Sequence, residues 1–219
     1  MLPKPTLIFD FDGTIADTLP LLVRLTNRLA PEYGYRMVQD EDLETLRSLH
    51  AREVVRWLGV PWYQLPRLAR RFRAELRLQM PQVAPVAAVP TALNDLSLQF
   101  SLGIVTTNSV ANVRMFLSTH RISHFAFVYA SRRLLGKRRT LRRVLRERRL
   151  VAKHTLYIGD EVRDVEAAQT CGLDALAVSW GANDAVRLQQ ANPFSVVDCP
   201  ATLPEAVRAW SQAKGATFG

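Results

Sequence analysis

The sequence predicts an α/β protein whose core is a doubly wound parallel sheet, with a small all-helical unit inserted after the first strand. Two patterns predict the sheet. Several short apolar runs are continuous rather than alternating, as in strands covered on both faces, and segments of helical periodicity separate most of them. A third observation predicts the insert, because residues 17–82 contain amphipathic helical patterns but no convincing strand. A chain of 219 residues, 48% of them hydrophobic, suits one domain that carries a smaller insert.

Outside the insert, predicted strands and helices alternate along the chain. The strands are expected at residues 7–11, 102–106, 125–129, 155–158, 175–179 and 195–197. The helices are expected at residues 109–121, 138–150, 163–171, 184–191 and 203–213. Because parallel neighbours in a sheet need crossover helices of this kind, the alternation favours a parallel, doubly wound sheet.

Three amphipathic patterns make up the predicted insert, at residues 19–29, 43–58 and 65–78. The break Gly59-Val60-Pro61 separates the last two, and the proline-rich stretch 81–90 is the expected return linker. We therefore expect a core formed by residues 1–16 and 83–219, and a helical domain formed by residues 17–82.

Composition excludes several classes of protein. Cys171 and Cys199 are too few for a disulfide framework, and no Cys/His cluster indicates zinc. The uncharged stretches 78–94 and 96–113 are interrupted by prolines or rich in polar residues, so neither predicts a membrane span. The first apolar run reaches Asp10 too early to be a secretory signal. We expect a cytoplasmic protein with no membrane partner, acting as a monomer or homodimer.

The basic residues are concentrated in one segment. Residues 131–149 contain ten Lys or Arg and one acid, Glu147, so this segment carries the whole net charge of +9. Such a patch can bind nucleic acid or another anion, or attract a phosphorylated substrate. The alternative is the solvated face of a helix whose apolar stripe contains Leu141 and Val144. No aromatic residues interleave the run, which makes nucleic acid the less favoured partner without excluding it.

Ligands of an open parallel sheet bind beyond the carboxyl ends of its strands, so the polar residues there are the candidates for a site. Asp10 and Asp12 stand at the end of the first predicted strand, two residues apart and hence on the same side. Two facing carboxylates repel unless a cation or a proton lies between them, which indicates either a metal or an acid with a base. Gly13 allows a tight exit into the insert.

The fourth predicted strand leads to two further acids. Asp160 stands at its end, and Asp164 follows at the start of the next helix, where it could also be a helix cap. Several hard oxygen ligands that converge on one point suit magnesium, which prefers carboxylates, waters and substrate phosphate. The set of acids therefore indicates an Mg2+ site.

Phosphate-binding groups follow the second and third predicted strands. Thr106, Thr107 and Asn108 precede a helix, so their polar atoms and the helix N-terminus form a potential phosphate cradle, although the same residues are ordinary N-caps. Lys137 follows the third strand, where it is suited to neutralising phosphate and a carboxylate, although it also lies in the basic run. The arrival of such groups at consecutive strand ends favours one common site.

This set of residues resembles, over essentially the whole chain, the haloacid dehalogenase superfamily of phosphohydrolases. Residues 10–18 (DFDGTIADT) are similar to its first motif, Thr106 to the second, Lys137 to the third and residues 159–164 (GDEVRD) to the fourth. The helical insert resembles the C1-type cap of the phosphoglycolate phosphatase-like branch, and residues 177–181 also resemble that branch. The resemblance implies a Rossmann-like catalytic core with a cap domain.

The resemblance also implies a reaction, the magnesium-dependent hydrolysis of a small phosphorylated metabolite. Asp10 would attack the phosphoryl group, and Asp12 would protonate the leaving oxygen and later deprotonate the hydrolytic water. The Asp10 carboxylate, the Asp12 backbone carbonyl and Asp160 would hold Mg2+, while Asp164 would order the metal waters or Lys137. The dehalogenases of the superfamily lack an acid at the position that corresponds to Asp12, because a halide needs no proton when it leaves. The acid at position 12 therefore favours phosphate esters as substrates.

The phosphoryl oxygens would be bound by the Thr106 hydroxyl and the Lys137 ammonium group, with Thr107 and Asn108 at the border of the pocket. Lys137 is followed by arginines instead of the more usual proline. Arg138 or Arg133 is therefore an alternative for the third-motif cation.

Substrate choice is expected to come from the insert, which closes over the site. Arg47, His50 and Arg52 are the candidates for binding a substrate carboxylate or a second anion, and a solvated surface is the alternative for them. Phosphoglycolate fits the resemblance, while a sugar phosphate or a nucleoside monophosphate fits the residues equally well. Two rival functions remain: a phosphomutase, which protects the same intermediate from water, and a non-catalytic protein that binds an anion through residues 131–149.

Overall fold

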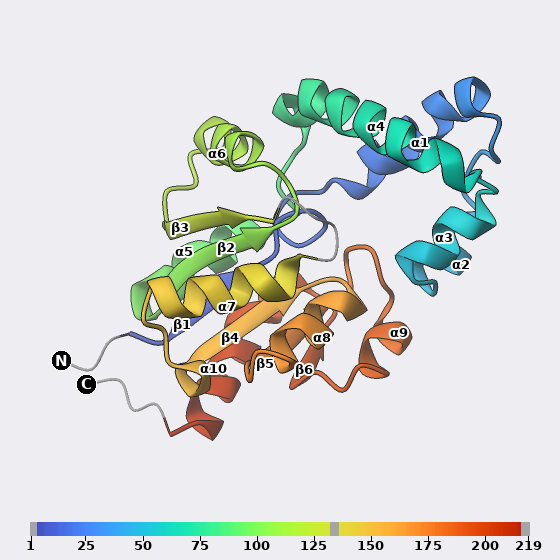
Figure 1. Cartoon of the computed structure of the whole chain (residues 1–219). Coiled ribbons are helices and arrows are strands. Elements are labelled where there is room, and N and C mark those ends of the chain that lie inside the picture. Colours follow the sequence, from blue (N-terminus) through green and yellow to red (C-terminus); the bar gives the residue numbers. More distant parts are fainter. Residues whose placement is uncertain (1–3, 132–135, 216–219) are drawn as a thin grey trace.

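A computed structural model describes residues 4–131 and 136–215 of the chain. Its centre is a six-stranded, wholly parallel sheet in the order β3-β2-β1-β4-β5-β6 (Figure 1). The strands are β1 (Thr6–Phe9), β2 (Ser101–Thr106), β3 (Phe125–Ala130), β4 (Thr155–Gly159), β5 (Asp174–Val178) and β6 (Ser195–Val197). The predicted fold class is confirmed, and every predicted strand is present with its ends shifted by two residues or fewer.

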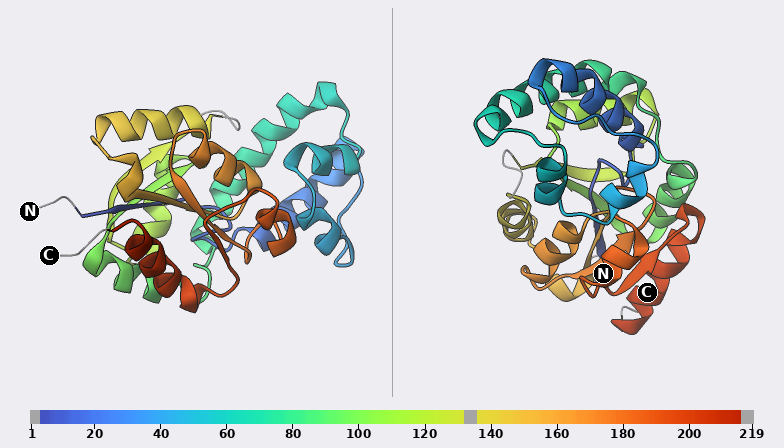
Figure 2. Two further views of the ribbon diagram at one scale, coloured as in Figure 1. Left: turned by 90° about the horizontal axis from the view of Figure 1, so that it is seen from below. Right: turned by 90° about the vertical axis from the view of Figure 1, so that its right-hand side faces the viewer.

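Helices cover both faces of the sheet, as Figure 2 shows. One face packs against α5 (Val89–Gln99), α6 (Val110–Thr119) and α10 (Leu203–Ala213), and the other against α7 (Lys137–Glu147), α8 (Val162–Gln169) and α9 (Ala185–Gln189). The strands alternate between the two cores, because successive side chains of a strand point to opposite faces: Leu7 and Phe9 pack into the first core and Ile8 into the second. All three side chains are fully buried, which explains the continuous apolar runs.

The helix α5 has no counterpart among the predicted elements, and its first residues occupy part of the expected return linker 81–90. Val89, Ala92, Leu93 and Leu96 form its buried face at helical spacing. Prolines and a lack of charge hid this pattern in the sequence. The proline at position 90 is in fact compatible with the helix, because it lies in the first turn, where no N–H is needed.

Residues 17–82, called the helical insert below, follow β1 and contain α1 (Leu19–Tyr33), α2 (Asp42–Arg47), α3 (Ala51–Trp57) and α4 (Leu65–Gln79). The prediction of one helix over 43–58 was wrong, since the chain breaks between α2 and α3. The backbone of His50 is extended at this break, and its N–H donates to the Glu53 carboxylate at 2.7 Å, which starts α3. The insert has a hydrophobic cluster of its own, built around Leu29, Tyr33 and Leu58.

The chain enters and leaves the helical insert along two segments that lie side by side. Ala16 and Pro85 form an antiparallel bridge, and the N–H of Asp17 donates to the carbonyl of Ala84 at 2.9 Å. Within the described ranges, no helix has the length and apolar character that crossing a bilayer requires.

Candidate functional site

Three buried carboxylates meet at the carboxyl edge of the sheet. Asp10 follows β1 and Asp160 follows β4, which are paired neighbours, and the N–H of Asp10 donates to the carbonyl of Ile158 at 2.8 Å. Asp164 reaches the same point from the first turn of α8. The three side chains are 3%, 1% and 1% exposed, and one oxygen of each lies within 4.8 Å of the others.

Lys137, the first residue of α7, provides the positive charge beside these acids. Its Nζ lies 2.8 Å from Oδ2 of Asp10 and also contacts Oδ1 of Asp164. These two carboxylates outweigh the effect of burial and raise the pKa of Lys137 well above its usual value, so the side chain stays charged. The alternative cation Arg138 is exposed, and Arg133 lies outside the described residues.

Asp160 is held tightly from two sides. Its Oδ1 accepts the hydroxyl of Thr14 at 2.7 Å, and its Oδ2 accepts the N–H of Ala182 at 2.8 Å. Gly13 lies against the same carboxylate, where a Cβ would be 2.9 Å from the Asp160 Cγ and closer still to an oxygen. Gly13 also has a φ of +75°, so both its backbone and its surroundings require glycine.

Asp12 was expected to share a strand with Asp10, and that expectation was wrong because β1 ends at Phe9. Its carboxylate turns toward β2, where Nδ2 of Asn108 lies 3.0 and 3.1 Å from its two oxygens. Burial and the charge of Asp10 raise the pKa of Asp12 to about 7, against the opposing effect of the Asn108 hydrogen bond. An acid with such a pKa is suited to both donating and accepting a proton near neutral pH.

The residues after β2 form a compact turn before α6. Oγ1 of the buried Thr106 accepts the N–H of Asn108 at 3.0 Å, and Thr107 lies half-buried between them. Oδ1 of Asn108 in turn accepts Nδ2 of Asn112 at 2.9 Å, which directs the amide nitrogen of Asn108 toward Asp12. Ser109 is the N-cap of α6, since its side chain accepts the N–H of Asn112 at 3.1 Å.

The electrostatics of the acids fit a divalent cation. Oδ1 of Asp10 and Oδ2 of Asp164 are buried without a hydrogen-bond partner. Burial, reinforced by the negative charges of Glu161 and Asp10, raises the pKa of Asp160 well above its usual value and that of Asp164 to about 7. Unpaired carboxylate oxygens at one point are ligands that hard cations such as Mg2+ prefer, so the donor set fits such an ion.

The three candidate residues of the helical insert have different surroundings. The guanidinium group of Arg47 contacts the carbonyl oxygen of Ser179, just after β5, and the His50 ring contacts the guanidinium group of Arg187 on α9. Arg52 is exposed. Arg47 and His50 thus contact the core. Of the three, only Arg52 has the solvated surface position that was the alternative to substrate binding.

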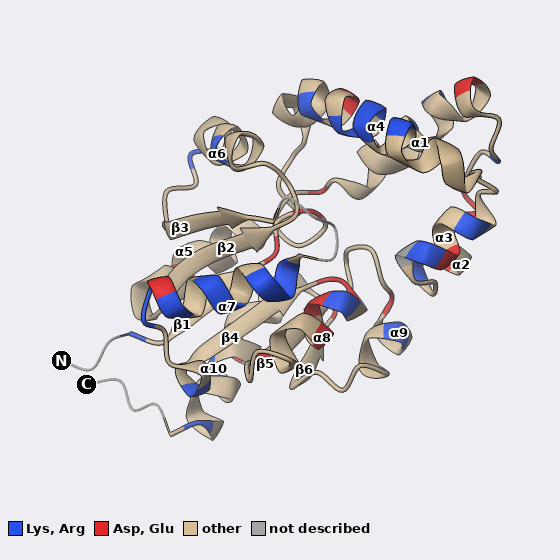
Figure 3. Ribbon diagram, in the orientation of Figure 1, with Lys and Arg blue, Asp and Glu red and all other residues tan. Residues whose placement is uncertain are grey.

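The exposed surface of α7 carries most of the described part of the basic segment (Figure 3), while Leu141 and Val144 pack into the core and Lys137 is buried. The sequence showed no aromatic residue within the run. The fold nevertheless places Tyr129 of β3 beneath it, with the guanidinium groups of Arg143 and Arg148 at 5.2 and 5.7 Å from its ring centre.

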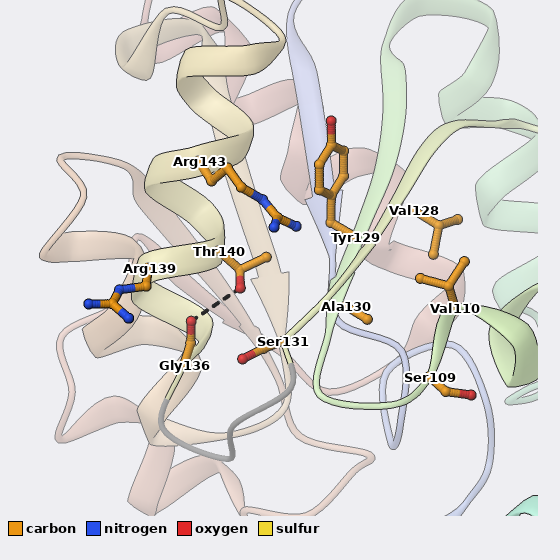
Figure 4. A pocket seen from close by; sticks show the side chains of 10 residues that line it. All are labelled: Ser109, Val110, Val128, Tyr129, Ala130, Ser131, Gly136, Arg139, Thr140 and Arg143. Carbon is orange, nitrogen blue, oxygen red and sulfur yellow. Dashed lines mark hydrogen bonds between the residues drawn. The ribbon is translucent and has the colours of Figure 1, made fainter.

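A hollow of about 680 Å³ lies next to this surface, at the carboxyl end of β3 (Figure 4). It is lined by Ser109, Val110, Val128, Tyr129, Ala130, Ser131, Gly136, Arg139, Thr140 and Arg143. None of the candidate carboxylates lines the hollow, so it is not the centre of the chemistry.

Sequence reasoning missed several groups that shape the site. Thr14 was seen only as part of a motif, although it binds Asp160 directly. Asn183 was not singled out, yet its backbone and side chain join Asp160, α8 and the helical insert. The glycine at position 181, beside Asp160, is a local signal that this loop comes close to the site.

Comparisons with known proteins agree with this geometry. Residues 7–178 match the family described as haloacid dehalogenase-like hydrolase. The phosphoglycolate phosphatase of Synechococcus elongatus is 37% identical over 203 residues, which cover 92% of this chain and 96% of that protein. A phosphoglycolate phosphatase of Agrobacterium fabrum is 25% identical, with 97% and 96% covered. The structure of a haloacid dehalogenase-like protein from Streptococcus pneumoniae aligns with a TM-score of 0.80 at 19% identity and covers 96% of this chain and 99% of its own. The chain belongs to the haloacid dehalogenase-like hydrolase family.

Proposed function

We propose that this chain is a magnesium-dependent phosphatase that hydrolyses a small phosphate monoester through an aspartyl-phosphate intermediate. One observation carries the proposal: Lys137 lies between Asp10 and Asp164, beside an acid, Asp12, whose pKa is raised to about 7. The family and the curated phosphoglycolate phosphatases among its relatives support assignment as a phosphoric monoester hydrolase.

The two aspartates divide the chemistry. A carboxylate oxygen of Asp10 bonds to phosphorus while the bond from phosphorus to the ester oxygen breaks, and Asp12 gives its proton to the departing oxygen. Asp12, now a carboxylate, takes a proton from water as the water oxygen attacks phosphorus. The bond between Asp10 and phosphorus then breaks, which releases inorganic phosphate and restores both acids.

The metal would be held by the carboxylates of Asp10 and Asp160 and by the backbone carbonyl of Asp12. When bound there, Mg2+ would neutralise the negative charge of the phosphoryl group beside that of the acids. Asp164 holds Lys137, as their contact supports, and would also orient the metal waters.

Lys137 and Thr106 would bind the transferring phosphoryl oxygens. In its bond to the N–H of Asn108 the Thr106 hydroxyl is the acceptor, so its own proton can still be donated to phosphate. Thr107 and Asn108 would border this pocket at the N-terminus of α6, a location that favours anions.

We further propose that residues 17–82 form a cap domain over a core of residues 1–16 and 83–219. The hydrophobic cluster of the insert and its paired linkers support this division, while Leu21, Leu25 and Met80 of the insert pack into the first core. Arg52, with its exposed guanidinium group, is then free to meet a substrate carboxylate, while Arg47 and His50 help to seat the cap. A small phosphorylated acid such as phosphoglycolate is the proposed substrate, which the 37% identical relative supports.

We propose that the protein acts in the cytoplasm as a monomer or a homodimer.

A phosphomutase is the second candidate, since the structure of a putative beta-phosphoglucomutase from Thermotoga maritima aligns with a TM-score of 0.66 at 20% identity, covering 93% of this chain and 98% of its own. The third is an anion-binding protein that uses the surface of α7, with its exposed arginines.

The deciding experiment is phosphate release from a panel of small phosphate esters, with Mg2+ and with a chelator. We expect hydrolysis by the wild type in Mg2+, and none in chelator or with Asp10→Asn. If folded protein in Mg2+ releases no phosphate, the phosphatase proposal fails. Turnover that then requires added bisphosphate indicates the mutase, and salt-sensitive RNA binding without turnover indicates the binding protein.

A further inference from the structure

One side chain joins the helical insert to the core beside the carboxylate cluster. Asn183 lies in the loop after β5 and is 8% exposed. Its Nδ2 donates to the carbonyl oxygens of Arg47 at 2.9 Å, at the end of α2, and of Leu49 at 3.3 Å, between α2 and α3. Its Oδ1 accepts the backbone N–H of Val162 at 3.0 Å, so the same amide group also caps α8.

The backbone around Asn183 is bonded to Asp160. The N–H of Asn183 donates to the carbonyl oxygen of Asp160 at 3.1 Å, and the N–H of Ala182 donates to Oδ2 of Asp160 at 2.8 Å. At Gly181 a Cβ would lie 2.5 Å from the Cβ of Asp160. Residues 181–183 therefore fix the position of Asp160 from the side that faces the insert.

The loop that contains Asn183 binds both the helical insert and the core. An amide side chain carries both a donor and an acceptor, so Asn183 can bond carbonyls of the insert and an N–H of the core at the same time. The loop also contacts the insert at further points, because the N–H of Asp184 donates to the Arg47 carbonyl at 3.4 Å and the Arg47 guanidinium group contacts the carbonyl of Ser179. Movement of the insert away from the core must break these bonds together.

We propose that Asn183 is a positioning residue that couples docking of the helical insert to placement of the Asp160 carboxylate. Because both depend on residues 181–183, a cation bound at Asp160 strengthens docking, and docking strengthens cation binding to the same extent. The inference rests on the proposed function only in taking Asp160 as a ligand of Mg2+.

The variant Asn183→Asp separates the two sides of this contact. Its carboxylate can still accept the N–H of Val162, so the contact with the core is kept. The donor to the carbonyls of Arg47 and Leu49 is replaced by an acceptor, so the insert contact is lost. Asn183→Ala loses the same donor without adding charge. The exposed Asn94 on α5 provides the matched control, Asn94→Asp.

The measurement is hydrogen exchange of residues 47–52 in the full chain, with and without Mg2+, together with Mg2+ affinity by calorimetry. In the wild type and in Asn94→Asp, we expect Mg2+ to slow this exchange. In both Asn183 variants we expect exchange about tenfold faster, no protection by Mg2+, and Mg2+ affinity several-fold weaker.

Each other outcome contradicts a specific part of the proposal. Exchange as slow in both Asn183 variants as in the wild type overturns the docking role. Faster exchange with unchanged Mg2+ affinity overturns the coupling to Asp160. If the wild type does not bind Mg2+, both the coupling and the proposed metal fail. Intact coupling without phosphate release from any ester contradicts only the proposed function.

Discussion

The amide nitrogen of Asn108 lies 3.0 and 3.1 Å from the two carboxylate oxygens of Asp12, so the end of β2 holds the acid that follows β1. This contact supplies a hydrogen bond that favours the ionised form of Asp12, while burial and Asp10 oppose it. The balance leaves Asp12 with a pKa of about 7, near the value at which one group serves best as both acid and base.

Asn108→Ala removes this hydrogen bond and leaves Asp12 less well oriented. We expect kcat to fall about tenfold, measured on the best ester of the panel. Asn94→Ala, at an exposed position on α5, is the control and keeps wild-type kcat. Unchanged kcat in Asn108→Ala would show that Asp12 does not depend on this contact.

Lys137→Met removes the ammonium group between Asp10 and Asp164. We expect phosphatase activity to fall by about a thousandfold, because the phosphoryl oxygens lose their cation and the acids lose their counter-charge. Arg138→Gln tests the alternative cation and is expected to keep activity within about twofold, since Arg138 is exposed. A large loss in Arg138→Gln with little change in Lys137→Met would reverse the assignment.

Gly13→Ala and Gly172→Ala form a matched pair. The two glycines have φ angles of +75° and +74°, so both substitutions cost about 1 kcal/mol of backbone strain. Only the Cβ at position 13 meets the Asp160 carboxylate, since nothing lies within 4 Å at Gly172. We expect a larger loss of Tm in Gly13→Ala, because the clash with Asp160 adds to the backbone strain, and weaker Mg2+ binding and lower activity only in that variant. Equal Mg2+ affinity in the two variants would contradict the close packing against Asp160.

The carboxylates also predict how the metal-free protein responds to pH. The pKa values of Asp12 and Asp164 are raised from 3.8 to about 7, so the folded state binds protons more tightly than the unfolded state. Their contribution to stability is therefore present below about pH 4 and is lost as pH rises through about 7.

In a chelator we expect a higher Tm at about pH 5 than at about pH 8, and a smaller difference in Asp12→Asn. Added Mg2+ is expected to restore stability at the higher pH, because it supplies the missing counter-charge. A Tm in chelator that rises from pH 5 to pH 8 would contradict the proposed electrostatics.

Local patterns predicted the fold and the carboxyl-edge residues, because a buried strand and the polar residues after it are adjacent in the chain. The same reasoning placed Asp10, Lys137 and Asp160 after the first, third and fourth strands, and the structure brings their side chains together. The break between α2 and α3 was missed, since an amphipathic pattern continues across residues 48–50, which lie outside both helices, with an extended backbone at His50.

Contacts between distant segments left no such signal. In the sequence Arg47 looks like a charged residue at the solvated end of a helix. Its guanidinium group nevertheless contacts the carbonyl of Ser179, 132 residues away. Asn183 likewise looks like an ordinary loop residue in the sequence. Its role depends on which backbone carbonyls the fold brings within hydrogen-bond distance of its side chain, and local patterns in one sequence do not show this.

The paired linkers at Ala16 and Pro85 have a consequence for how such chains diversify. Because the insert enters and leaves the core at one point, its helices can change in length or sequence without altering the register of the sheet. The carbonyls of Arg47 and Leu49 are the exception, since Asn183 ties them to the loop beside Asp160. A single gene can thus vary substrate preference around fixed chemistry as long as this contact is kept.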